Sequence, residues 1–256
     1  MLRTVATIYA IVMMVFFLGP ILIALPLSFN GAGFLSYPIN PFSLVWYEKI
    51  LAPVPWLRAF ANSLFVGLSA TLIATVLGVG AALALSRKDL PAKRLFLAII
   101  IAPMIVPSII LGLGLYFVFS QLQLNSTYLG VIIAHSVVCL PFVVIAVSAQ
   151  LQTFDVGLVR ASQSLGADNW KTLRSVVLPI IAPGVISGAI LAFVHSFDEV
   201  VMVLFIAGPQ QRTLPRQMFD GIKDNIDPSI FAVSTVLFVF TTTLMILVNR
   251  LSARKP

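Results

Sequence analysis

Three ionisable side chains lie close together in an otherwise apolar stretch of the chain. Asp198 and Glu199 are adjacent, and His195 precedes them by three and four residues, so a helix would bring His195 near both acids. Ionisable groups inside a membrane-length apolar segment are costly and usually face a cavity or a partner. Two interpretations are open. The acids are either a way-station, meaning a transient binding site, for a cationic substrate or part of a gate or salt bridge to a companion subunit.

Few other groups suit catalysis or metal binding. We expect His195 to hydrogen-bond Asp198 or Glu199 rather than bind a metal, because no further His or Cys is close in sequence. His135, in another apolar run, is expected to pack or to hydrogen-bond between helices. No arrangement of Ser, His, Cys and Asp pairs a nucleophile with a base, and no G-x-x-x-x-G-K-[ST] phosphate loop is present. We therefore predict no enzymatic activity, no metal and no cofactor in this chain itself.

The composition is that of a membrane protein. Of the 256 residues, 59% are hydrophobic and 10% are charged, whereas soluble domains carry about 25% charged residues. The first apolar run is longer than the core of a signal peptide and is followed by no small-residue cleavage site, so we expect it to be retained.

Six apolar runs are long enough to cross roughly 30 Å of hydrocarbon as helices. Asn62 and Ser63 are expected to cap the start of the second. Pro103, Pro107 and Pro141 interrupt the third and fourth; such breaks often border a translocation path, but kinks filled by packing explain them equally well. We predict an all-α membrane protein with one transmembrane domain and these approximate bounds: domain 1–256; spans 8–29, 61–85, 95–119, 128–149, 180–206 and 230–249.

The lysines and arginines predict the orientation. If the N-terminus is inside, the inner segments hold 11 of the 16 basic residues and the outer segments hold 5. This asymmetry predicts that both termini are cytoplasmic. Much of the net charge of +7 then faces anionic lipid rather than nucleic acid. The inner residues are Arg3, Arg87, Lys88, Lys93, Arg94, Arg160, Lys171, Arg174, Arg250, Arg254 and Lys255.

A polar segment, 154–179, separates two of the apolar runs. Three of its apolar residues share one helix face: Leu158, Ala161 and Leu165. Gly166 can end that helix in a left-handed conformation, Asp168 can cap a second helix, and Pro179 is expected to mark the next turn. The pattern predicts two short helices at the membrane surface that fit a groove in a soluble partner. The alternative is a long cytoplasmic loop without such a role.

This segment resembles the cytoplasmic loop of ABC importer permeases. That loop reads Glu-Ala-Ala, three residues, Gly, nine residues, Ile, one residue, Leu-Pro. The spacing is kept here, although Arg160 replaces the usual Glu and Ser162 the second Ala. In the family this loop is the coupling helix that contacts the ATPase subunit. The resemblance therefore implies ATPase coupling by Leu158, Arg160, Ala161, Ser162, Leu165, Gly166, Leu178 and Pro179.

The motif from His195 to Glu199, followed by Ile206-Ala207-Gly208-Pro209 and Leu214-Pro215, is similar to the spermidine/putrescine branch of these permeases. The resemblance implies a type I importer fold in the bacterial inner membrane. It also implies a second, non-identical permease, two ATPase subunits that bind ATP and Mg, and a periplasmic binding protein. The implied substrate is a small cation such as spermidine or putrescine. Importers of iron, opines and other organic solutes share much of the pattern.

One rival belongs to a different class of protein. A secondary transporter would use Asp198 and Glu199 as a proton relay and would need no ATPase. It leaves the spacing of residues 160–179 unexplained.

Overall fold

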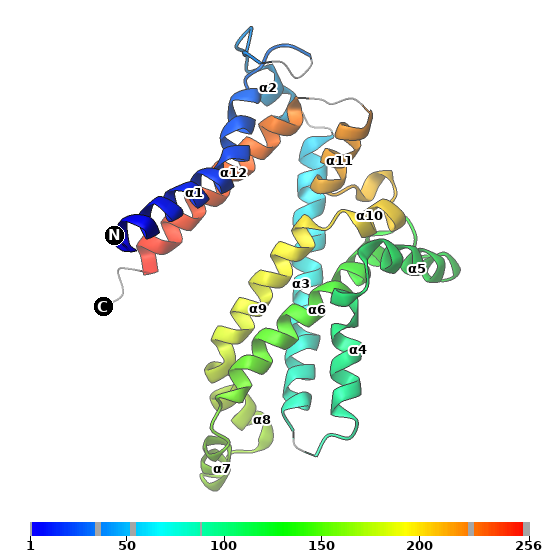
Figure 1. The fold of residues 1–256 in the computed structure, drawn as a ribbon. Helices are drawn as coiled ribbons and strands as arrows, with labels where there is room; N and C mark the ends of the chain where they lie inside the picture. Colours follow the sequence, from blue (N-terminus) through cyan, green and yellow to red (C-terminus); the bar gives the residue numbers. More distant parts are fainter. Residues whose placement is uncertain (1, 34–36, 52–54, 88, 225–227, 253–256) are drawn as a thin grey trace. The chain divides into compact units, whose positions relative to one another are not determined.

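The computed structural model describes residues 2–33, 37–51, 55–87, 89–224 and 228–252, which form helices joined by turns (Figure 1). Lys88, Arg254 and Lys255, used above to predict the orientation, lie outside these ranges. The chain divides into two compact units by its internal contacts. Unit 1 is Met1–Arg58 with Gln217–Pro256, and unit 2 is Ala59–Arg216.

Unit 1 contains the first and last long helices. α1 (Leu2–Leu27) and α2 (Val45–Leu51) both pack against α12 (Ser229–Ser252). A hydrogen bond of 2.7 Å between the hydroxyls of Ser28 and Tyr47 joins the end of α1 to α2. The most apolar stretch of α1 buries none of its residues within the chain, so lipid or another subunit must cover it.

Unit 2 is built on three long helices: α3 (Trp56–Ser86), α6 (Tyr128–Gln152) and α9 (Leu178–Asp198). α6 packs extensively against α9 and carries much of the core. Glycines permit close approach to it, because a Cβ on Gly188 would lie 2.9 Å from the Cα of Val143, and one on Gly78 would lie 2.7 Å from its Cγ1. Small residues at such crossings are typical of helices packed in membranes.

The third predicted span, 95–119, is not one straight helix. α4 (Lys93–Ile105) and α5 (Ser108–Gln121) meet at 105°. Pro107 explains the break, since it has no N–H to donate and disfavours helical geometry at the residue before it; Val106 is indeed extended. Pro103 and Pro141 instead stay inside helices, so only one of the three prolines ends a helix.

The fifth predicted span, 180–206, is also interrupted. α9 ends at Asp198, Glu199 is extended, and a short helix, α10 (Val201–Ile206), follows and packs against α5. Beyond it come a 3-10 turn (η2, Pro209–Gln211) and α11 (Leu214–Asp224). Among the described residues, four helices are long and apolar enough to cross a membrane, or five if α4 and α5 count as one span.

Candidate functional site

The polar segment after α6 folds into a helix that ends at Gly166. α7 spans Gly157–Ser164, and Gly166 follows with φ of +83°. The N–H of Gly166 donates to the carbonyl of Gln163 (3.0 Å), and the N–H of Ala167 donates to that of Ser162 (3.2 Å). These two bonds are the helix-ending pattern that a left-handed residue makes possible. The predicted role of Gly166 as a helix stop is confirmed.

The second short helix, α8 (Asn169–Thr172), begins as predicted. The carboxylate of Asp168 accepts a hydrogen bond of 2.7 Å from the N–H of Lys171, which satisfies a donor that the first turn leaves unpaired. The hydroxyls of Ser162 and Thr172 lie 3.1 Å apart and join the two helices. The turn between α7 and α8 is therefore stabilised by the left-handed conformation of Gly166, the Asp168 cap and the hydrogen bond between Ser162 and Thr172.

The prediction of a turn at Pro179 is wrong. α8 runs through a π-helical turn (η1, Leu173–Val177) directly into α9, and Pro179 lies in the first turn of α9. A proline inside an α-helix clashes with the carbonyl four residues earlier. The wider π turn lies at that position and accommodates it. α8 is thus an extension of the long helix α9 rather than a separate element.

Several predicted coupling residues project from α7 and its turn. Leu165 is 89% exposed, and Leu158 is 43% exposed. Trp170, which the motif did not single out, is 68% exposed on α8. Arg160, Ala161, Gly166 and Pro179 are exposed, and Ser162 is partly buried. Leu178 instead packs against the core, so it anchors the segment to unit 2 and does not form part of its exposed surface.

The two acids at the end of α9 have different surroundings. Glu199 is only 8% exposed, and its Oε1 accepts a hydrogen bond of 3.0 Å from the N–H of Met202. It therefore caps the start of α10. Asp198 is exposed and has no hydrogen bond or ion pair with any residue that the structure describes. The break in the helix therefore gives Asp198 and Glu199 different roles, which their adjacent positions in the sequence did not reveal.

The expected hydrogen bond from His195 to the acids is absent from the described residues. The His195 ring packs on Phe142 instead, with centroids 4.7 Å apart. The helix ends at Asp198, so the regular spacing does not carry Glu199 back to His195. No group of three or more His, Cys, Asp or Glu in the described chain is arranged to hold a metal ion.

His135 joins α6 to α9 just before the break. It is fully buried, and its Nδ1 lies 2.8 Å from the hydroxyl of Ser196. One turn along α6, the thiol of Cys139 donates to the carbonyl of Ala192. The prediction that His135 hydrogen-bonds between helices is confirmed. The two bonds hold the last turns of α9 against α6.

The side chain of Asn62 fixes the segment beyond α10 by hydrogen bonds, an arrangement that we call the Asn62 clamp. Its amide nitrogen donates to two backbone carbonyls, those of Gln210 (2.7 Å) and Arg212 (2.8 Å). Its oxygen accepts from the hydroxyl of Tyr128 (2.9 Å). Asn62 lies inside α3, which begins at Trp56, so the predicted helix-capping role is wrong. Its partners are far away in the sequence, and no local pattern identified them.

Two further bonds fix the same segment. The hydroxyl of Ser63 accepts from the N–H of Leu214 (2.8 Å), so Ser63 does not cap the start of α3 either. The guanidinium of Arg216 donates to the carbonyl of Val203 (3.1 Å). Together with the Asn62 clamp, these bonds make residues 207–216 an ordered part of unit 2 beyond the end of α9 (Figure 1).

Comparison with known proteins identifies the family. Residues 74–255 match the family described as binding-protein-dependent transport system inner membrane component. The chain is 31% identical over 235 residues to the spermidine/putrescine transport system permease protein PotC of Escherichia coli K12, covering 92% of this chain and 88% of PotC. It is also 31% identical to the putative 2-aminoethylphosphonate transport system permease protein PhnV of Salmonella paratyphi A, covering 96% and 92%.

The fold is also that of a solved transporter. A bacterial ABC transporter involved in the import of the acidic polysaccharide alginate matches with a TM-score of 0.74 and 14% identity, over 99% of this chain and 97% of the other. Components of this kind are non-catalytic, multi-pass proteins of the bacterial inner membrane that work with an ATPase and a binding protein. The chain therefore belongs to the binding-protein-dependent transport system inner membrane components, as a permease of an ABC importer.

Proposed function

We propose that this permease carries a small cationic amine, with a polyamine such as spermidine or putrescine as its substrate. The observation that carries the proposal is the exposed, unpaired Asp198 at the C-terminal end of α9. The last four carbonyls of a helix lack partners within it, and the aligned peptide dipoles place a partial negative charge there. A carboxylate at the same point adds a full charge. Helix ends at breaks of this kind hold cations in other transporters.

The relatives favour an amine without deciding which one. PotC is named for spermidine and putrescine, and PhnV for 2-aminoethylphosphonate. All three compounds carry an amino group that is protonated at neutral pH. Asp198 is the way-station in this proposal, and His195 lies on the same helix, one turn earlier. Glu199 contributes by capping α10. Iron, opines and other organic solutes remain the alternative substrates.

We further propose that the α7–α8 segment docks on the ATPase. Its support is the exposed apolar pair Leu165 and Trp170, which a groove in a soluble partner would cover. Because α8 continues into α9, movement of the docked segment is transmitted toward Asp198 at the other end of that helix. The contact surface consists of Leu158, Arg160, Ala161, Ser162, Leu165 and Gly166, with Leu178 and Pro179 supporting it from α9.

The proposed complex contains this chain, a non-identical second permease, two ATPase subunits that bind ATP and Mg, and a periplasmic binding protein. We propose a type I importer fold in which the chain is a single transmembrane domain. It would cross the membrane six times, with α4–α5 and α9–α10 as broken spans and both termini in the cytoplasm. The bias of lysine and arginine supports this orientation.

The orientation predicts which engineered cysteines react from outside. Gln210 and Lys171 are both exposed, near opposite ends of unit 2, and the native Cys139 is buried. A membrane-impermeant maleimide should label Gln210→Cys in intact spheroplasts and label Lys171→Cys only after permeabilisation. Labelling of Lys171→Cys alone in intact spheroplasts would show that the orientation is opposite to the one proposed. The α7–α8 segment would then not face the ATPase.

Reconstituted uptake tests the function. Liposomes that contain the complete complex, supplied with ATP and the binding protein, should accumulate labelled spermidine or putrescine. This chain without the ATPase should accumulate neither, with or without a proton gradient. Gradient-driven uptake by the chain alone would establish the secondary transporter instead. A complex that hydrolyses ATP but accumulates neither polyamine would contradict the proposed substrate while leaving the assignment as an importer unchanged.

A further inference from the structure

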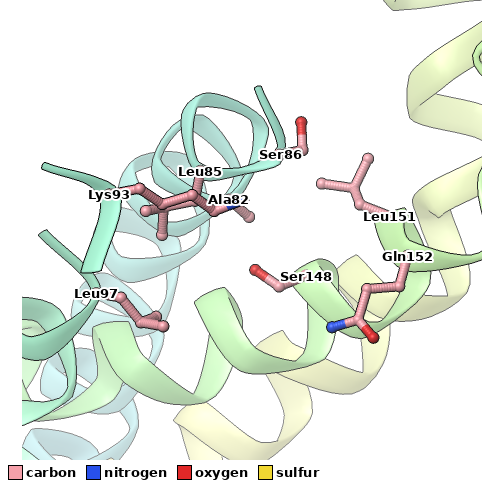
Figure 2. A pocket seen from close by; sticks show the side chains of 8 residues that line it. All are labelled: Ala82, Leu85, Ser86, Lys93, Leu97, Ser148, Leu151 and Gln152. Carbon is pink, nitrogen blue, oxygen red and sulfur yellow. The ribbon is translucent and has the colours of Figure 1, made fainter. Parts of the chain in front are cut away.

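A crevice of about 250 Å³ lies at the end of unit 2 from which the α7–α8 segment emerges. It is formed by the last turns of α3 and α6 and the first turns of α4. Figure 2 shows Lys93 and Leu97 of α4 on one side and Ser148 and Gln152 of α6 on the other. Leu85 and Leu151 complete the part of the lining that matters here. The crevice plays no part in the coupling segment or the cation path described above.

The polar half of the crevice suits an anion with several oxygens. Lys93, Ser148 and Gln152 have no side-chain hydrogen bond or ion pair with any described residue. An ammonium, a hydroxyl and a carboxamide that line one cavity can all donate hydrogen bonds. A phosphate group would satisfy these donors together.

The apolar half points to a lipid as the source of that phosphate. Leu85, Leu97 and Leu151 line the same crevice, and α4 buries none of its residues within the chain. The crevice lies where three apolar helices end, which is the level of the lipid headgroups. A headgroup would meet the polar side chains while its acyl chains lie along the exposed face of α4.

We propose that this crevice binds the headgroup of an anionic phospholipid. Its volume is below the roughly 300–1,000 Å³ of sites that enclose a whole small molecule, which fits a headgroup with its chains outside. The exposed Arg87 lies close in sequence to the crevice and adds to the local attraction for negative lipid. The proposal does not depend on the identity of the transported substrate.

Lipid retention by the purified complex tests the proposal. The permease, with its partner subunits, is placed in nanodiscs of phosphatidylglycerol and phosphatidylcholine, and retained lipid is counted by native mass spectrometry. The wild-type complex should keep phosphatidylglycerol in preference to phosphatidylcholine. Lys93→Gln should reduce this retention about fivefold, because it removes the charged donor that lines the crevice. Arg94→Gln is the matched control, because it removes a charge from the next residue, which does not line the crevice.

The remaining outcomes overturn the proposal. Equal loss in Arg94→Gln and Lys93→Gln would show a diffuse surface attraction with no site. Full retention in Lys93→Gln, at a normal yield of complex, would exclude the crevice. Displacement of the lipid by soluble glycerol 3-phosphate at equal concentration would identify a free anion rather than a lipid as the occupant. A photo-crosslinker at Leu97 that captures a subunit instead of lipid would show that protein covers the crevice.

Discussion

Replacing Gly166 by valine should reduce ATPase copurification and ATP-driven uptake at least tenfold while the helices remain inserted. Gly166 has a φ of +83°, and a left-handed conformation costs an L-residue about 1–2 kcal/mol, more when the side chain is β-branched. A Cβ at this position meets nothing within 4 Å, so the effect is conformational rather than steric. The backbone at residue 166 must then leave the left-handed region. This change breaks the two hydrogen bonds that end α7 and alters the orientation of α7 relative to α8.

Asparagine provides the matched control at this position. Gly166→Asn adds a polar side chain of similar size but tolerates the left-handed conformation. It should keep most of both copurification and uptake. Wild-type values in Gly166→Val would remove the coupling role from this turn. Equal losses in both variants would mean that the partner cannot accept any side chain there, so the conformation would not be the cause.

Asp198→Asn should lower polyamine uptake at least tenfold without loss of the complex. Asp198 is exposed at the end of α9 and has no partner among the described residues, so neutralising it breaks no internal bond. A carboxylate attracts an ammonium at about 4 Å by roughly 4 kcal/mol at an effective dielectric constant near 20. Removal of even half of that energy exceeds tenfold. ATPase activity stimulated by the loaded binding protein should persist, because the substrate interaction differs from the coupling contact.

Glu199→Gln is the control for this experiment. The amide oxygen of glutamine can still accept the hydrogen bond from the N–H of Met202 that caps α10, so uptake and yield should stay near wild type. Glu199→Ala loses the cap and should reduce stability by about 0.5–2 kcal/mol. Wild-type uptake in Asp198→Asn, or failure explained by a lower yield, would contradict the way-station. Equal defects in Asp198→Asn and Glu199→Gln would mean that the two acids act as one unit.

The features that the sequence predicted correctly depend on short stretches of chain. Apolar runs of membrane length require helices in a bilayer, because each backbone N–H and C=O must be paired within its own segment. The turn at Gly166 and the cap at Asp168 were predictable for the same reason, since each is decided within a few residues. The motif spacing around them was sufficient to identify an importer permease before any tertiary contact was known.

Other features were decided by partners that no local pattern could reveal. Asn62 has the sequence signature of a helix cap, yet it holds carbonyls about 150 residues away. Glu199 and Asp198 look equivalent in the sequence, but after the break at the end of α9 Glu199 is buried and bonded to the N–H of Met202, whereas Asp198 is exposed. Pro107 breaks a helix while Pro141 does not. A polar group in the chain's interior takes whichever partner packing brings within reach, so its role follows from the tertiary structure.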